Sequence, residues 1–262
     1  MQDITDIFPP SIYCALINAR NWARGKKHRI RPTLEQNIYR VTDGENELFI
    51  CRRKRHNRSK NGIVAGVEAL AKQYSLEHIP LSPGDWFIDC GANIGELGVW
   101  AKHRDLHYIA FEPETLEARC VNLNAYGGEN NVNRLALWSE DAVLDFFSKP
   151  GTADSSAIEI SDFDAVHKVQ ARRLDAIITN IPTNSKVVLK IEAEGAEPEV
   201  LAGSEGILSK VDYIAIDCGF ERGKEGAHTF TETNSFLVDR GFRVEIAKFP
   251  RMTMIYKNIK NI

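Results

Sequence analysis

Three glycines follow a short apolar segment that ends in an acidic residue. Residues 86–98 read Trp-Phe-Ile-Asp-Cys-Gly-Ala-Asn-Ile-Gly-Glu-Leu-Gly, so Asp89 precedes Gly91, Gly95 and Gly98. A strand that runs into a glycine turn and then a helix is typical of sites that bind nucleotide cofactors. We expect Gly91 to let the backbone approach a ligand closely, and Gly95 to let the helix pack tightly on the strand. A tight turn without any ligand is the alternative.

The glycine spacing restricts the kind of cofactor. The segment has the spacing Gly-x-x-x-Gly-x-x-Gly, and Asn93 stands where the dinucleotide fingerprint Gly-x-Gly-x-x-Gly has its second glycine. Close approach of a pyrophosphate needs that glycine. The spacing therefore argues against a nicotinamide dehydrogenase and favours a cofactor that lacks a diphosphate.

A second acidic residue follows the next predicted strand. Residues 107–111 lead into Ala-Phe-Glu-Pro, which places Glu112 about 20 residues after the turn, where a carboxylate can accept both ribose hydroxyls. The alternative is a carboxylate that stabilises a helix N-terminus. Together the two segments indicate a nucleoside with free 2′ and 3′ hydroxyls and no diphosphate, and S-adenosylmethionine meets that description.

A third segment places four carboxylates after a buried strand. Residues 189–203 read Leu-Lys-Ile-Glu-Ala-Glu-Gly-Ala-Glu-Pro-Glu-Val-Leu-Ala-Gly. Ligands bind beyond the carboxyl ends of such strands. Glu192, at the strand end, is the better site candidate, whereas Glu197 and Glu199 fit the helix N-terminal preference for acidic residues.

The elements that must position these residues alternate from residue 85 onward. We predict strands at 85–90, 107–112, 132–138, 186–192, 211–218, 241–247 and 251–257, and helices at 92–104, 114–126, 172–180, 196–209 and 229–240. This alternation indicates an α/β fold with a doubly wound, mostly parallel sheet. The last two strands have too short a connection for a parallel pair, so they must be antiparallel. Polar residues 139–171 could form a lid or face the acceptor.

Residues 1–80 are predicted to be a small helix and hairpin appendage to a cofactor-binding domain at 81–262. A helix at 11–24 has Ile12, Ala15, Leu16, Ala19 and Ala23 on one face, residues 36–52 fit a hairpin, and a helical pattern returns at 61–79. The appendage has 14 Lys and Arg against 8 Asp and Glu, a net charge of +6, and the remainder has 19 against 28, a net −9. This favours either a solvated basic face or contact with an anionic partner, such as a phosphate-bearing acceptor or a membrane surface.

Composition restricts the remaining classes. The five cysteines form no Cys-x-x-Cys pair, which argues against a zinc site and a disulfide framework. No stretch of about 18 apolar residues is present and no signal peptide is apparent, so a cytoplasmic location is expected. Glu192, Asp217 and Glu221 could converge on a metal, but their spacing is not that of metal ligands, so we predict none. The basic run at 52–60 has few aromatic neighbours, so nucleic acid is not an expected partner.

Three motifs together resemble the FkbM family of S-adenosylmethionine-dependent methyltransferases. They are Phe-Ile-Asp-Cys-Gly-Ala-Asn-Ile-Gly, Phe-Glu-Pro, and Leu-Lys-Ile-Glu-Ala-Glu-Gly-Ala-Glu-Pro-Glu-Val-Leu-x-Gly, and the likeness covers about residues 85–220. The third motif is the specific one, although Glu192 replaces the family's usual Asp and Ala193 its Val. The resemblance implies a Rossmann-like class I methyltransferase fold and O-methylation of a hydroxyl, commonly on a sugar or a secondary metabolite.

Site residues follow from this resemblance by position. Asp89, Gly91, Asn93 and Gly95 would surround the methionine part and Glu112 would hold the ribose. Ala136, Leu137 and Trp138 would lie near the adenine, although Trp138 fits a core position equally well.

A general base would help a sugar hydroxyl to react. Glu192 and Glu194 are the first candidates, followed by Asp217 and by His228, which fits an exposed loop position as well. A catalytically silent binding module and an RNA methyltransferase are the rival functions.

Overall fold

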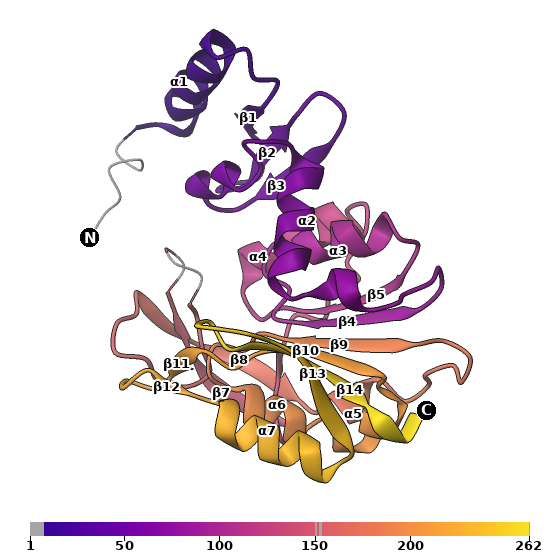
Figure 1. Cartoon of the computed structure of the whole chain (residues 1–262). Coiled ribbons are helices and arrows are strands. Elements are labelled where there is room, and N and C mark those ends of the chain that lie inside the picture. The colour runs from indigo at the N-terminus through magenta and orange to yellow at the C-terminus, as the bar shows by residue number, and fades with distance from the viewer. Residues whose placement is uncertain (1–7, 150, 152–153, 262) are drawn as a thin grey trace.

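A six-stranded, mostly parallel sheet forms the centre of the computed structural model, which describes residues 8–149, 151 and 154–261 (Figure 1). The strand order is β13-β14-β10-β9-β4-β5. Four neighbouring strands are parallel, and β14 is antiparallel to both β10 and β13. The predicted α/β class and the antiparallel C-terminal pair are therefore confirmed. The strands are β4 (Trp86–Cys90), β5 (His107–Phe111), β9 (Val187–Ile191), β10 (Tyr213–Asp217), β13 (Phe242–Lys248) and β14 (Thr253–Asn258).

Helices cover both faces of this sheet (Figure 1). Strand side chains alternate between the two layers, so Phe87 and Val188 pack into one core while Ile88 and Leu189 pack into the other. Because both faces are covered, β9 and β10 are buried along their whole length. One layer contains α2 (Ile63–Gln73), α3 (Glu96–Lys102) and α4 (Thr115–Ala125), and the other contains α5 (Leu174–Ile177), α6 (Glu197–Ala202) and α7 (Phe230–Asp239).

The predicted strand at 132–138 is largely absent. Only β6 (Ala136–Leu137) forms, and it joins a separate sheet of order β6-β8-β7, with β7 at Ala142–Ser148 and β8 at Ala165–Arg172. A single bridge between Phe111 and Asn133 links this segment to the central sheet. The polar sequence of 139–171 shows only a short strand-like piece at Leu144–Phe147 within β7 and none at β8, because one face of each strand is largely exposed.

Residues 8–79 contain a three-stranded antiparallel sheet of β1 (Arg29–Pro32), β2 (Tyr39–Thr42) and β3 (Glu47–Ile50), preceded by α1 (Pro10–Ala23). The β2–β3 pair is the predicted hairpin. One hydrophobic core runs from Tyr13 through these strands and α2 to Phe87 in the central sheet. The core is thus continuous across residue 80, where the sequence predicts a boundary.

The apolar face predicted for residues 11–24 does form, but it faces solvent. Ile12 and Leu16 are exposed, whereas Tyr13 and Cys14 on the opposite side are buried against the N-terminal strands. The helix is apolar on two sides, and the aromatic ring of Tyr13 gives the second side the larger burial. The sequence pattern therefore identified the helix and its apolar face, and the structure leaves that face exposed.

Short elements complete the fold. A two-stranded hairpin of β11 (Phe220–Arg222) and β12 (Ala227–His228) follows β10. Short 3₁₀ helices occur at η2 (Arg53–Asn57), η3 (Leu76–His78), η4 (Glu205–Lys210) and η5 (Ile259–Asn261). All five cysteines are buried and free. Within the described ranges, no helix has the length and apolar character needed to cross a membrane.

Candidate active site

The glycine turn after β4 has a backbone that only a few residue types adopt easily. Gly91, Asn93 and Gly95 all have positive φ, at 76°, 51° and 81°, so α3 begins only at Glu96 rather than at residue 92. A Cβ on Gly91 would lie 2.0 Å from the carbonyl oxygen of Glu192, at the end of neighbouring β9. The turn therefore brings the ends of β4 and β9 together, which requires glycine at position 91.

Gly95 has a different neighbour from the one its position predicts. A Cβ there would lie 3.0 Å from the Cα of Val121, so the close packing is against α4 rather than against the strand. Asn124 of α4 reinforces this contact by donating to the carbonyl of Ile94 at 2.7 Å. The same amide donates to the carbonyl of Phe49 in β3 at 2.8 Å, which ties the N-terminal sheet to the turn.

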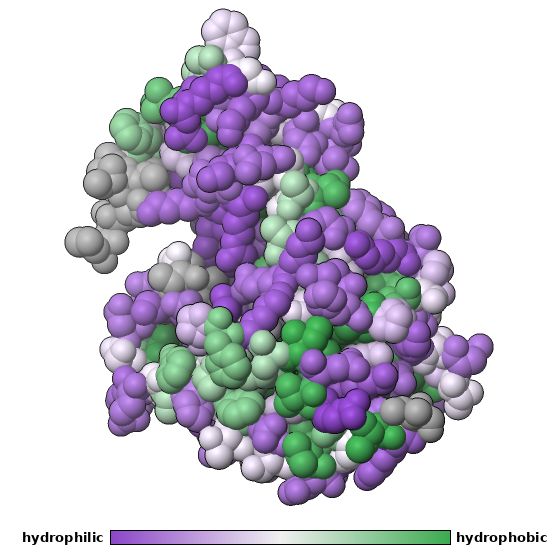
Figure 2. Space-filling model, in the orientation of Figure 1, coloured by the Kyte–Doolittle hydropathy of each residue, from purple (hydrophilic) through white to green (hydrophobic). Residues whose placement is uncertain are grey.

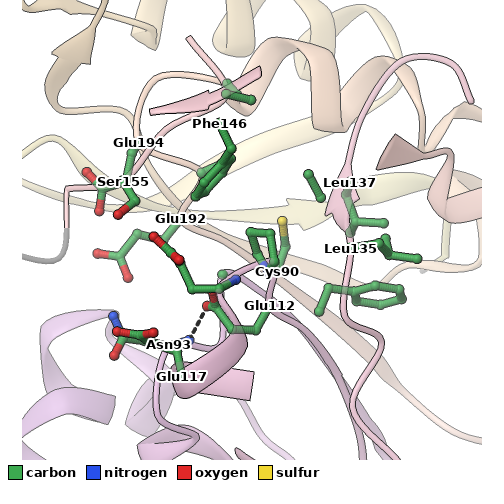
Figure 3. A pocket seen from close by; sticks show the side chains of 18 of the residues that line it. Cys90, Asn93, Glu112, Glu117, Leu135, Leu137, Phe146, Ser155, Glu192 and Glu194 are labelled. Atoms are coloured by element: carbon green, nitrogen blue, oxygen red, sulfur yellow. Dashed lines mark hydrogen bonds between the residues drawn. The ribbon is translucent and has the colours of Figure 1, made fainter. Parts of the chain in front are cut away.

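A cavity, which we call the first cavity, opens beside this turn (Figure 3). Glu112 extends toward it from the end of β5. Its carboxylate accepts the backbone N–H of Asn93 at 2.7 Å and that of Glu114 at 2.9 Å. The second bond lies at the start of α4, so Glu112 both caps that helix region and faces the cavity. Burial raises the pKa of Glu112 to about 8.

The walls of the first cavity suit a nucleoside. In Figure 3, Leu135 and Leu137 lie on one side, Glu192, Glu194 and Ser155 lie on the other, and Glu112 lies between them. Apolar side chains offer a surface for a planar base, and a carboxylate offers an acceptor for sugar hydroxyls. The side-chain oxygen of Asn93 is buried and has no hydrogen-bond partner among the described residues, so it is available to a ligand. These features fit S-adenosylmethionine.

A buried lysine separates the first cavity from a second. Lys190 of β9 is 2 % exposed and lies 3.0 Å from Asp89 and 3.5 Å from Glu192. Its ammonium also donates to the carbonyls of Cys90 and Gly91, at 3.1 and 2.7 Å. Burial alone would lower the pKa of Lys190, but the two carboxylates outweigh it and the pKa is raised. The group is therefore a permanent cation that joins the ends of β4 and β9.

The second cavity shares Gly91, Asn93, Glu192 and Glu194 with the first. Ionisable side chains dominate its lining. They come from the N-terminal segment, from the ends of β4 and β9, from the start of α3, from the insertion at 139–171, from the β11–β12 hairpin and from the turn between β13 and β14. They include Arg55, Arg58, Asp89, Glu96, Asp154, Lys190, Glu221 and Arg251. A pocket of this kind suits a polar acceptor.

The carboxyl groups of the second cavity differ in how readily they ionise. Burial would raise the pKa of Glu192, but the charges of Lys190 and Arg251 lower it overall. Burial and the nearby carboxylates raise the pKa of Glu221 to about 7 and that of Glu194 to about 10. At neutral pH, Glu192 is a stable anion, Glu194 is protonated and Glu221 is close to half ionised.

Arg251 explains the environment of two predicted catalytic residues. Its guanidinium donates to Glu192 at 2.8 Å and also pairs with Asp217 at the end of β10. Asp217 is fully buried and does not line either cavity. Its contact with Arg251 therefore positions the arginine beside Glu192. Glu197 also acts on the loop, since its carboxylate accepts the N–H groups of Ala193 and Gly195.

The structure brings most of the predicted site residues together. Gly91, Asn93, Glu112, Ala136, Leu137, Glu192 and Glu194 line the first cavity, and Asp89 lines the second. Trp138 does not line either one: its ring packs against the core of the β6-β8-β7 sheet, and its carbonyl faces Gly203. His228 is also outside both cavities, exposed on β12 with its ring edge-on to that of Phe220.

Sequence reasoning missed several residues of this site. Lys190 could have been found, because a lysine in the apolar run Val-Val-Leu-Lys-Ile needs a buried partner. Arg251 gave no local signal, because its role depends on the strand order, and Glu221 was named only as a possible metal ligand. The insertion at 139–171 contributes Phe146 to the first cavity and Asp154 to the second.

Two further observations concern the loop after β9 and the binding of metal ions. Ser156 donates to the carbonyl of Glu194 at 2.7 Å, which fastens the insertion to the loop after β9. In the part of the chain that the structure describes, no group of three or more His, Cys, Asp or Glu is arranged to hold a metal ion.

Comparison with known proteins agrees with this geometry. The model of the methyltransferase FkbM domain matches residues 89–244. The AMB antimetabolite synthetase AmbE of Pseudomonas aeruginosa is 24 % identical over 215 residues, which cover 66 % of this chain and 10 % of that protein. The chain thus spans about a tenth of that curated relative.

Solved structures give weaker likenesses. The ribosomal protein L11 methylase of Lactobacillus delbrueckii subsp. bulgaricus is 12 % identical, with 75 % of this chain and 79 % of that chain covered and a TM-score of 0.40. The magnesium protoporphyrin IX methyltransferase of Synechocystis PCC 6803 is 12 % identical, with 78 % and 83 % covered and a TM-score of 0.41. The family match covers more than half of the chain, so this protein belongs to the FkbM family and is an S-adenosylmethionine-dependent methyltransferase.

Proposed function

We propose that the protein transfers a methyl group to a hydroxyl of a saccharide or saccharide precursor. The observation that carries this proposal is the second cavity, which adjoins the first and is lined mainly by carboxyl and guanidinium groups. Such groups pair with the many hydroxyls of a sugar. An acceptor that carries a phosphate or a lipid-linked phosphate would also find Arg55, Arg58 and Arg251 there.

The cofactor is proposed to occupy the first cavity. Leu135, Ala136, Leu137 and Phe146 would contact the adenine, and Glu112 would accept the ribose hydroxyls. Asn93 and the backbone at Gly91 would hold the methionine part, near the wall that both cavities share. When bound, S-adenosylmethionine supplies a methyl group that is already activated by a positively charged sulfur.

The protein must align the acceptor oxygen and remove its proton as the oxygen gains the methyl group. Among the carboxyl groups of the second cavity, Glu221 is the best general base because its pKa is near neutrality. Glu192 was the first candidate from sequence, but a carboxylate held by Lys190 and Arg251 is a weak base. Glu194, protonated at neutral pH, would donate a hydrogen bond to the acceptor.

A small metabolite is the second candidate acceptor. The observation in its favour is the likeness to AmbE, whose name describes the synthesis of an antimetabolite. The same base and the same cofactor position would serve either acceptor, so the two candidates differ only in the molecule that fills the second cavity.

The decisive experiment is a screen with S-adenosylmethionine that carries a deuterated methyl group. Monosaccharides, sugar nucleotides, lipid-linked sugars, hydroxylated small metabolites and RNA are each incubated with the enzyme, and products are detected by mass spectrometry. Label in a saccharide supports the proposal, and label confined to a metabolite or to RNA would refute it. Absence of cofactor binding in calorimetry would instead indicate a catalytically silent module.

The structure gives little support to RNA as the methyl acceptor. The basic run at 52–60 was its main basis, yet Arg52 pairs with Glu117, and both Arg55 and Arg58 pair with Glu96. These arginines join the N-terminal segment to the catalytic domain, so they do not form a free basic surface. A cytoplasmic location stays a prediction.

A further inference from the structure

The exposed side of α1 is an apolar face with no covering element among the described residues. Ile12 and Leu16 are 47 % and 55 % exposed, and Ala15, Ala19 and Ala23 continue the same face along the helix. The helix lies at the end of the molecule farthest from the β13–β14 pair (Figure 1). An apolar face of this length on a terminal helix is unusual for a surface that contacts only water.

Aromatic and basic residues border this face. Trp22, on one edge, is 74 % exposed, and Phe8 just before the helix is 43 % exposed. Arg20 lies on the other edge, one turn after Leu16, and Arg24 lies one turn after Arg20. Figure 2 shows apolar and hydrophilic side chains next to each other over α1. Tryptophan and arginine at the borders of an apolar stripe are typical of helices that lie in a membrane interface.

A basic cavity adjoins the same helix. Four cations, Arg20, Arg24, Lys26 and Lys60, line it together with buried His28 and His56, and no carboxylate is among the described residues that do so. His28 contacts the carbonyl of Ser59 at 3.1 Å and His56 at 3.3 Å, which holds the cavity floor in place. A cavity with this charge suits the phosphate of a lipid headgroup.

We propose that α1 and this basic cavity dock the enzyme on an anionic lipid bilayer. Ile12, Leu16 and Trp22 would enter the interface while Arg20, Arg24 and Lys26 contact headgroup phosphates. The charge of the cavity selects this occupant, because an apolar protein partner would leave four cations without counter-charges, and a second copy that docks through the same face of α1 would bring four further cations to it. The inference concerns binding alone, so it stands or fails independently of the acceptor.

Sedimentation with vesicles of phosphatidylcholine, with and without phosphatidylglycerol, tests the proposal on the full chain. We expect binding to the anionic vesicles only, weakened as salt is raised. The emission of Trp22 should shift to the blue on binding, and Trp22→Phe should abolish the shift while the other tryptophans remain. Equal binding to neutral vesicles, or none to anionic ones, would overturn the proposal.

Matched variants separate the two parts of the surface. Leu16→Glu and Arg24→Glu should each weaken vesicle binding by about tenfold or more. The controls are Val238→Glu on α7, an exposed apolar residue, and Arg243→Glu on β13, an exposed arginine, and neither should change binding. Because all four positions are exposed, thermal unfolding should be unchanged, which excludes misfolding as a cause.

Two rival occupants give different results. If a second copy covers α1, light scattering would show a dimer that Leu16→Glu dissociates, with no vesicle binding. If the cavity serves a free anion, calorimetry would show that inorganic phosphate binds the wild type and not Arg24→Glu. The two proteins would then bind vesicles equally well. Either result would refute the proposal.

Discussion

The two cavities share a wall but differ in how their charges are compensated. In the first cavity, Glu112 is balanced by two backbone N–H groups, from Asn93 and Glu114, and the remaining walls are largely apolar. In the second, carboxylates are balanced by Lys190 and by Arg251. The first arrangement combines a buried acceptor with apolar walls, which suits a nucleoside cofactor. The second sets several carboxyl groups beside cations and includes Glu221, whose pKa is about 7, which suits proton transfer.

The strongest test of this comparison is the removal of the cation between the cavities. Lys190→Met would leave Asp89 buried without its cation and Glu192 with Arg251 alone, and should lower the free energy of unfolding by about 3–5 kcal/mol. Urea denaturation measures this. The double variant that combines Lys190→Met with Asp89→Asn should lose less free energy of unfolding than the two single variants lose in sum. Lys257→Met, on a partly exposed lysine 3.8 Å from Glu245, is the control and should cost less than about 1 kcal/mol. If Lys190→Met lowers the free energy of unfolding no more than Lys257→Met does, Lys190 is not the buried cation that stabilises the ends of β4 and β9.

The next effect concerns the general base. Glu221→Gln should lower turnover by about 100-fold or more with the affinity for S-adenosylmethionine unchanged, because only proton removal is lost. Rates are measured with the acceptor found in the screen. Glu225→Gln, exposed in the same hairpin, is the matched control and should keep the wild-type rate. A Glu221→Gln enzyme with near-normal turnover would exclude this residue as the base.

The pH dependence sharpens the same assignment. A base acts in its ionised form, and burial raises the pKa of Glu221 to about 7, so turnover should be low in acid, rise through that pH and level off above it. The wild-type profile should lose this rise in the Glu221→Gln variant. A profile that rises instead between pH 4 and 5, about the ordinary range of a glutamate, would indicate a different base.

The smallest effect is expected outside both cavities. His228 lies exposed on β12, so His228→Ala should change turnover by less than about threefold. Steady-state kinetics under the conditions used for Glu221→Gln gives the comparison. A large loss would mean that the β11–β12 hairpin moves His228 toward the acceptor during the reaction.

Sequence predicted the first cavity better than the second, for a physical reason. The turn at Gly91 and the carboxylate of Glu112 depend on local backbone patterns, namely a strand end followed by a glycine or by a helix start. The second cavity is assembled from Arg55, Asp154, Lys190, Glu221 and Arg251. The first and the last of these residues are 196 positions apart in the sequence. No local pattern encodes the strand order that brings them together.

The fold shows the same division. Fully buried strands such as β9 and β10 were found at nearly their observed positions because burial on both faces leaves a continuous apolar run. Residues 142–148 showed only a short strand-like piece at Leu144–Phe147, and 165–172 were missed, because the two strands form a half-exposed sheet. The sequence showed the apolar face of α1 but not which side of the helix is buried, because Tyr13 and Cys14 compete with Ile12 and Leu16 for burial, and only tertiary packing decides between them.

The most direct test of the division between cofactor and acceptor cavities is calorimetric binding of S-adenosylmethionine to two variants. At pH 9, where Glu112 is ionised because its pKa is raised to about 8, Glu112→Gln should weaken binding by about 10- to 100-fold, because a carboxylate that accepts ribose hydroxyls contributes about 1.5–3 kcal/mol. Glu221→Gln should bind as the wild type does. Equal affinity of Glu112→Gln and wild type, or an equal loss in both variants, would contradict the assignment of the first cavity to the cofactor.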